Sequence, residues 1–164
     1  ELIWIADEGT MKITAINSQN GQVVRTIPII IPRGKGFSSI EGIAWDGNYL
    51  WTALYAGFSS SFNQVNPQNG KIIKSTYADC NPRGIASDGT YLWSICYNGK
   101  DLPSKIDRRN IHGKEHEMLR SRKFIADIEG LEPEALAYDG QYLWYTDRQS
   151  GRILRLYPVN VKKK

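Results

Sequence analysis

The chain has 164 residues, of which 41% are hydrophobic and 11% aromatic, and its formal net charge is +4 at pH 7. This length predicts a single domain, 1–164, with a real core, because it is short for two domains. Since Lys162, Lys163 and Lys164 supply three of the positive charges, the rest of the chain is nearly neutral, which argues against a nucleic-acid-binding protein. No apolar run approaches the length of a membrane span; the longest, residues 27–32, is short and bracketed by prolines.

The chain begins at Glu1 and opens directly in a strand-like segment, with no visible signal peptide. We expect that such a peptide was removed or that the chain is a piece of a longer protein. The first 31 residues predict three strands: 2–6, 12–16 and 22–27. Residues 32–39 are rich in Gly, Ser and basic residues and predict a loop.

A hexapeptide, Asp-Gly-x-Tyr-Leu-Trp, then occurs three times, at 46–51, 88–93 and 139–144. Each copy follows a short apolar run, and an Asp-Gly pair between two such runs is a strong hairpin signal. The copies are about 42 and then about 51 residues apart, which is the spacing of repeated structural units.

Taken in order, the repeats predict four antiparallel strands per unit, with units at about 1–31, 40–77, 83–125 and 133–161. The turn after the third strand of the third unit is expected to be expanded, over 108–117. Units of this kind predict an all-β fold, a β-propeller of four-stranded blades, with a solenoid as the less favoured alternative. The Trp of each repeat aligns with Trp4, so we expect a structural, buried series: Trp4, Trp51, Trp93 and Trp144.

The number of blades in the closed ring stays open at this point. The first unit lacks its opening strand and the fourth lacks its closing strand, so the two ends do not complement each other. Either the chain is a four-bladed ring with irregular ends, or it is part of a larger ring completed by missing sequence or a second chain. We favour the partial ring.

Two cysteines, Cys80 and Cys96, allow at most one intramolecular disulfide. If Asp88 and Gly89 form a two-residue turn, positions 81 and 96 lie opposite each other and Cys80 lies diagonally near Cys96. A bridge is therefore feasible, but two separate buried thiols are the favoured interpretation.

The units resemble the broad superfamily of NHL, YncE-like, streptogramin-lyase-like and YWTD propellers. Residues 143–153 are similar to the YWTD strand and its following turn, and residues 66–73 resemble the turn of YncE-type blades. These motifs imply blade geometry rather than a ligand. In YWTD-like blades the Asp three residues after the Trp is structural, which implies that role for Asp7 and Asp147.

A narrower resemblance links residues 41–46 to the opening motif of gluconolactonase and regucalcin blades, with Ile43 where that group has Pro. In that group the matching Glu is a divalent-metal ligand, so the resemblance implies a metal-binding role for Glu41. A metal-dependent lactonase or lyase is therefore the alternative function.

Charged residues begin the innermost strand of three consecutive units, at the expected channel mouth: Glu41, Arg83 and Glu134. Loops on the same face add Tyr55, Tyr97 and Arg148. We expect this set to bind a protein or a small polar ligand, or else to be merely solvated.

The segment 112–117 carries two histidines, His112 and His116, and two carboxylates, and could hold zinc on the opposite face. A solvated loop is the favoured interpretation there. No cofactor is expected apart from a divalent cation at Glu41 and Glu134 or at these histidines. The sequence thus predicts a non-catalytic binding or scaffolding module.

Overall fold

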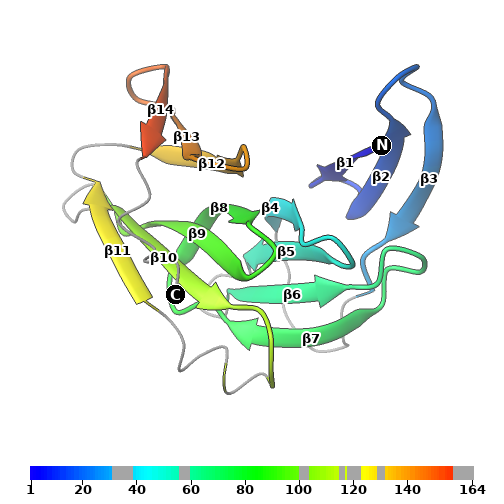
Figure 1. The fold of residues 1–164 in the computed structure, drawn as a ribbon, viewed down its shortest axis with the longest axis horizontal. Helices are drawn as coiled ribbons and strands as arrows, with labels where there is room; N and C mark the ends of the chain where they lie inside the picture. The colour runs from blue at the N-terminus through cyan, green and yellow to red at the C-terminus, as the bar shows by residue number, and fades with distance from the viewer. Residues whose placement is uncertain are drawn as a thin grey trace.

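In a computed structural model the chain is all-β across the residues that the structure describes, which are 1–30, 39–55, 60–99, 104–114, 117, 123–128 and 132–156. Lys162, Lys163 and Lys164 and part of the expected loops lie outside these ranges. The described strands form four antiparallel sheets in chain order. Figure 1 shows the sheets following one another around an arc, with the first and last sheets on opposite sides.

The first sheet contains β1 (Leu2–Asp7), β2 (Lys12–Asn17) and β3 (Val23–Pro28). The second contains β4 (Ser39–Trp45), β5 (Leu50–Tyr55), β6 (Ser61–Val65) and β7 (Ile72–Tyr77). The first sheet agrees with the three strands predicted from the sequence, and the second agrees with the four-stranded unit predicted at 40–77. Strand β1 corresponds to the second strand of the later sheets because it carries Trp4.

The third sheet contains β8 (Asn81–Ser87), β9 (Tyr91–Tyr97), β10 (Ser104–Asn110) and β11 (Lys123–Ile128). The fourth contains β12 (Pro133–Tyr138), β13 (Leu143–Asp147) and β14 (Arg152–Leu156). Strand β10 runs three residues further than expected, so Arg108 to Asn110 belong to the sheet and not to the expanded turn. The contacts of Arg109 hold this longer strand in the sheet, because its buried guanidinium donates hydrogen bonds to Asp79 at 2.7 Å and to the Ala78 carbonyl at 3.0 Å.

The Asp-Gly pair does not occupy the turn in the way that was expected. Asp88 donates its backbone N–H to the Tyr91 carbonyl, and Ser87 pairs with Leu92, so Gly89 and Thr90 are the two turn residues. Gly89 has a φ of 83°, which Gly adopts without steric cost. Asp88 precedes the turn because its Oδ1 accepts hydrogen bonds from the backbone N–H groups of Thr90 and Tyr91.

The two cysteines form a disulfide, with the Cys80 and Cys96 Cα atoms 5.8 Å apart. The expectation of two separate thiols is therefore wrong. The shifted register places Pro82 opposite Cys96, and a bulge follows between Pro82 and Gly84. Cys80 lies two residues before Pro82, within bridging distance of Cys96.

Consecutive sheets pack face to face through apolar side chains. The innermost strand β8 packs against both β4 and β12. Ala86 lies in the cluster shared with the fourth sheet, whereas its neighbour Ile85 lies in the cluster shared with the second. The innermost strand therefore presents a small residue to one neighbouring sheet and a large residue to the other.

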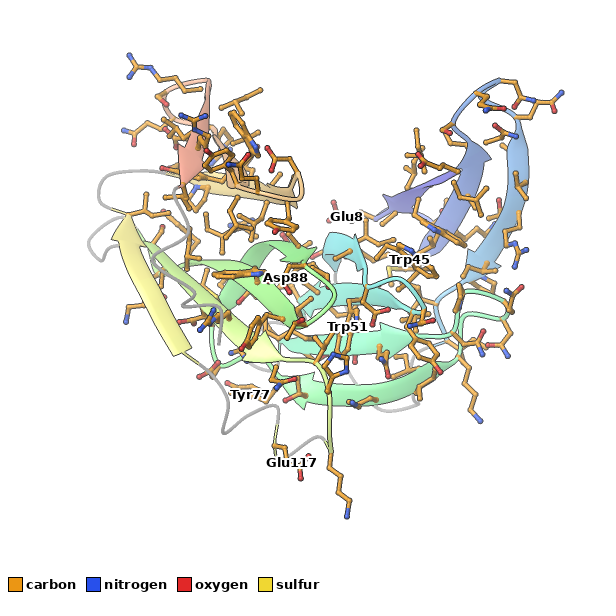
Figure 2. All side chains as sticks on the ribbon, in the orientation of Figure 1. Glu8, Trp45, Trp51, Tyr77, Asp88 and Glu117 are labelled. Carbon is orange, nitrogen blue, oxygen red and sulfur yellow. A yellow bond between two sulfur atoms is a disulfide. The ribbon has the colours of Figure 1, made fainter. Side chains whose placement is uncertain are left out.

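The tryptophan series is buried only in the middle of the chain. Trp51 is 0% exposed and Trp93 is 3% exposed, as predicted. Trp4 and Trp144 are half-buried, Trp144 because it belongs to the last sheet of the arc and Trp4 because it lines an open groove between the first and second sheets. Trp4 stacks on the exposed Trp45 at 6.1 Å between ring centroids, and Figure 2 shows Trp45 on the side of the second sheet that faces the first.

Candidate functional site

The starts of the three innermost strands meet on one face of the molecule. Because β8 packs between β4 and β12, Arg83 on β8 lies between Glu41 and Glu134 on its neighbours. Arg83 Nη1 lies 3.5 Å from Glu41 Oε2, and Ser39 donates its hydroxyl to Glu41 Oε1. The predicted convergence of this strand position is therefore an observed contact for Glu41 and Arg83.

Arg148, in the loop after β13, joins this group from the fourth sheet. Its Nη2 and Nε lie 2.7 and 3.1 Å from Glu132 Oε2, and its Nε lies 3.2 Å from Glu134 Oε1. The hydrogen bond to Glu132 and the charges of Glu132 and Glu134 raise the pKa of the Arg148 guanidinium above its usual value. Arg148 is thus a permanent cation held by two carboxylates.

An aromatic ring completes this group. The Arg83 guanidinium lies 5.5 Å from the centroid of the Tyr97 ring, within the range of a cation–π contact. A small open cavity of about 160 Å³ lies between these side chains. We call it the mouth pocket; its lining residues are Arg83, Tyr97, Glu132, Pro133, Glu134 and Arg148.

The structure connects five of the six residues predicted at the channel mouth. Four of them line the mouth pocket: Arg83, Tyr97, Glu134 and Arg148. Glu41 does not line the pocket but contacts Arg83. Tyr55 does not line it; it is half-buried and pairs with Ser39 at the end of the second sheet.

Glu132 was missed by the sequence interpretation. Its side chain is 25% exposed and makes the shortest ion pair with Arg148. The local signal is the segment Glu132-Pro133-Glu134, which carries a second carboxylate two residues before the predicted one. The equivalent strand positions of the three repeats gave Glu41, Arg83 and Glu134, and Glu132 does not occupy such a position.

The residues of the metal-binding hypotheses make other contacts where the structure describes them. The Glu41 and Glu134 carboxylates both contact arginines. His112 is exposed and its backbone N–H is bonded to Asn110 Oδ1 at 2.8 Å, whereas His116 lies outside the described residues. Within the described ranges no group of three or more His, Cys, Asp or Glu side chains could hold a metal ion.

Asp7 and Asp147 make local turn contacts. Asp7 accepts a hydrogen bond from the Thr10 hydroxyl at 2.7 Å, and this bond lowers the pKa of its carboxyl. Burial alone would raise the pKa of Asp147, but hydrogen bonds from Ser150 and from the Glu132 amide lower it. Asp147 therefore also holds Glu132 beside the mouth pocket, where Glu132 pairs with Arg148.

A larger open groove lies between the first and second sheets, with a volume of about 520 Å³. Its lining residues are Glu1, Leu2, Trp4, Arg25, Trp45, Pro67 and Gln68. Apart from Trp4, none of these residues was singled out from the sequence, because the groove depends on the packing of the first two sheets.

No protein-family model matches the chain, and no curated protein matches it in sequence. Solved structures do match. The chain is similar to a chain of hydrazine synthase from Kuenenia stuttgartiensis, with 17% identity and a TM-score of 0.54 over 95% of this chain and 46% of that chain. It is also similar to a chain in a nidogen/laminin complex, with 16% identity and a TM-score of 0.53 over 96% of this chain and 76% of that chain.

The fold is that of a β-propeller. The four sheets are blades in successive positions, packed through their innermost strands, and the sequence prediction of this fold class is confirmed. The chain spans less than half of the hydrazine synthase chain that it matches. At these identities the likeness concerns the fold alone. Within the described ranges, no helix has the length and apolar composition that crossing a membrane requires.

Proposed function

We propose that the protein is a non-catalytic binding module that takes a cationic side chain of a peptide or protein partner into the mouth pocket. The observation that carries this proposal is the cluster of polar side chains from two adjacent blades around one open cavity. Arg83 and Tyr97 of the third blade line one side of this cavity, and the Glu132–Arg148–Glu134 group of the fourth blade lines the other. Membership of the NHL or YWTD propellers is part of the same proposal.

The size of the mouth pocket supports a side chain rather than a free small molecule. Sites for drug-sized molecules usually have volumes of about 300–1,000 Å³. The mouth pocket has about 160 Å³ and is open to solvent. A single polar side chain fills such a space, and the rest of a partner can then lie across the rim, where Arg148 is exposed.

The charge around the pocket supports a cation. Two guanidinium groups, Arg83 and Arg148, are balanced against three carboxylates. Glu134 is the most accessible of these carboxylates, with 52% of its side chain exposed. A Lys or Arg side chain entering the pocket would meet Glu134, and Tyr97 offers a ring face for the same cation.

The test is a binding screen against a library of short peptides, followed by titration of each hit with the chain and its variants. Glu41→Gln/Glu134→Gln should weaken binding of Lys- or Arg-containing peptides at least about tenfold. Its melting temperature should change little, because the Arg148–Glu134 ion pair joins exposed side chains and Gln at position 41 can still accept the hydrogen bond from the Ser39 hydroxyl. Glu8→Gln, on an exposed turn of the first blade, is the matched control.

One outcome would contradict the proposal, and a further variant would then locate the site. Peptide hits that bind the double variant with unchanged affinity would place the site elsewhere. If Trp45→Ala then abolished that binding, the site would be the groove between the first and second blades, which Trp45 lines.

The alternative, a lactonase- or lyase-like enzyme with a divalent metal, requires the Glu41 or Glu134 carboxylate to exchange its arginine partner for the ion. An enzyme of this kind would lose turnover by several orders of magnitude in the double variant and lose stability with a chelator. A binding module would show neither effect.

A further inference from the structure

The three charged residues at the starts of the innermost strands share a backbone irregularity. The register of β8 with β9 passes from Pro82 directly to Gly84, so Arg83 is an extra residue on β8. Glu41 on β4 and Glu134 on β12 are skipped in the same way. A β-bulge re-aims the side chain of its extra residue, and bulges are over-represented next to functional sites. The repeated bulge therefore accounts for how these three side chains reach the mouth.

The two arginines of the mouth pocket differ in how far their hydrogen-bond donors are used. Arg148 lies 2.7 and 3.1 Å from one carboxylate oxygen and 3.2 Å from a second. Among the described residues the only acceptor that contacts Arg83 is Glu41 Oε2, 3.5 Å from Nη1. A charge-assisted N–H···O bond is usually about 2.7–2.9 Å long, and a guanidinium carries several N–H donors. Arg83 therefore keeps most of its donors for a ligand, on a side chain that is 38% exposed.

Glu134 is the corresponding acceptor on the opposite side of the pocket. Its side chain is 52% exposed, and its contact within the described chain is with Arg148 Nε at 3.2 Å. Glu132 is less available, because its side chain is 25% exposed and pairs with Arg148 at 2.7 Å. The pocket thus presents an anion-binding group from the third blade and a cation-binding group from the fourth.

We propose that the occupant of the mouth pocket is the C-terminal residue of a partner chain, a Lys or Arg whose free carboxylate binds Arg83 and whose cationic side chain binds Glu134. This inference rests on the proposed function, because it specifies which cationic side chain enters the pocket. A terminal Lys or Arg carries both charges on one residue. An internal Lys or Arg has no carboxylate of its own and would leave the donors of Arg83 unused. Capture of a terminal carboxylate is a recurring mode of peptide recognition.

The size of the pocket favours one residue over two. Its volume is about 160 Å³, which is roughly the share of five water molecules in the liquid. An acidic and a basic side chain from two separate residues need more room than this. A terminal residue also enters an open cavity with chain on one side only, whereas an internal residue must bring chain on both sides past the rim.

Two further side chains of the pocket offer surface for the methylene stem of a Lys or Arg. They are Tyr97, at the end of β9, and Pro133, at the start of β12. Lys and Arg side chains bury their stems along apolar surface while the charged head reaches a polar partner. The Tyr97 ring also lies 5.5 Å from the Arg83 guanidinium, so it helps to orient the group that receives the carboxylate.

The disulfide stiffens the side of the pocket that receives the carboxylate. Cys96 immediately precedes Tyr97, and Cys80 lies three residues before Arg83. The bridge joins the segment before β8 to the end of β9, close to the place where the bulge interrupts the register. Groups that are held in place before binding lose less conformational entropy when the ligand arrives. The backbone that carries Arg83 and Tyr97 is held in this way.

The first experiment compares peptides that differ only at their C-terminus, by fluorescence anisotropy with the native chain. One peptide ends in Lys with a free carboxylate, the second has the same sequence with a terminal amide, and the third ends in Gln with a free carboxylate. Loss of either charge should weaken binding at least about tenfold, because it leaves Arg83 or Glu134 without its partner. Equal affinities for the acid and the amide would overturn the proposal, and this comparison needs no variant.

Variants then assign each charge of the peptide to its partner. Arg83→Gln should remove the preference for the acid over the amide and keep the preference for Lys over Gln. Glu134→Gln should do the reverse. Arg155→Gln is the matched control, because Arg155 is an exposed arginine that does not line the mouth pocket. Circular dichroism and melting verify that each variant is folded. An Arg83→Gln variant that keeps the full preference for the acid would overturn the assignment of the carboxylate.

This inference and the proposed function fail in different ways. If acid and amide peptides bind alike and Glu134→Gln weakens both, the pocket takes a cationic side chain but not a chain terminus, and only the inference is overturned. If no peptide binds in a way that depends on Glu134, both the inference and the proposed function are overturned.

Discussion

The aspartate of each Asp-Gly-x-Tyr-Leu-Trp hairpin holds the turn and the tryptophan together. In the third copy Asp139 Oδ1 accepts hydrogen bonds from the Gln141 and Tyr142 amides, and Oδ2 accepts one from Trp144 Nε1 at 2.6 Å. Asp46 and Asp88 bond to their own tryptophans in the same way, at 2.7 and 2.9 Å. A buried indole N–H needs a hydrogen-bond partner, and this carboxylate is that partner.

This arrangement predicts a dependence of stability on acid. The hydrogen bonds from Tyr142, Trp144 and Gln141 lower the pKa of Asp139 from its ordinary value of 3.8. The stability that the carboxylate contributes is therefore fully present above pH 3.8 and is lost as the pH falls through the lowered folded-state pKa. Urea unfolding at several pH values measures it. Asp139→Asn should flatten this part of the profile, and an unchanged profile would contradict the assignment.

Gly84 is a second residue whose identity is dictated by its neighbours. Ala at this position would put a methyl group against the backbone of β12, which cannot move as a flexible side chain could. We expect Gly84→Ala to lower the free energy of unfolding by about 1–3 kcal/mol. Ala135→Gly at the equivalent exposed position is the control and should cost about 1 kcal/mol or less. Equal losses in denaturant melts would mean that the blades do not approach as closely as the structure has them.

At the scale of the blade, equivalent tryptophans should contribute different amounts to the free energy of unfolding, according to their place in the chain. Trp93 is buried under the fourth blade, so Trp93→Ala should cost about 3–5 kcal/mol through lost burial and the cavity left behind. Trp144 is half-buried, so Trp144→Ala should cost less than about half of that amount. Urea melts of the two variants measure the difference. A loss below about 1 kcal/mol for Trp93→Ala would contradict the blade alignment.

The elements that were predictable from sequence are those set by local chemistry. The hairpins follow from Gly at the turns and from apolar strands on either side, so nearly all strands of the first two blades were located correctly. The turn register was wrong because the Asp88 side chain caps the turn rather than occupying it. That error of register also weakened the case for the Cys80–Cys96 bridge.

Contacts between distant segments could be predicted from one sequence only where a repeat relates the segments. Arg109 lies in a stretch that looked like a solvated turn, yet it is buried against Phe62, with its guanidinium 4.8 Å from the ring centroid. At the channel mouth, the repeat placed Glu41 and Arg83 at equivalent positions, which was enough to predict that they meet. Glu132 has no such repeat, and its role depends on how the loop after β13 brings Arg148 to it.

At the scale of the whole molecule, burial is concentrated in the two middle blades. The second and third blades are covered on both faces, whereas the first and fourth blades, at opposite ends of the arc in Figure 1, each leave one face exposed. Local opening costs less where fewer apolar contacts must be broken. The end blades should therefore open before the middle ones.

Hydrogen exchange measured by mass spectrometry tests this order. At low protein concentration, amides of β1–β3 and β12–β14 should exchange faster than those of β5 and β9, which carry Trp51 and Trp93. Equal protection of all four blades would contradict the concentration of burial in the two middle blades.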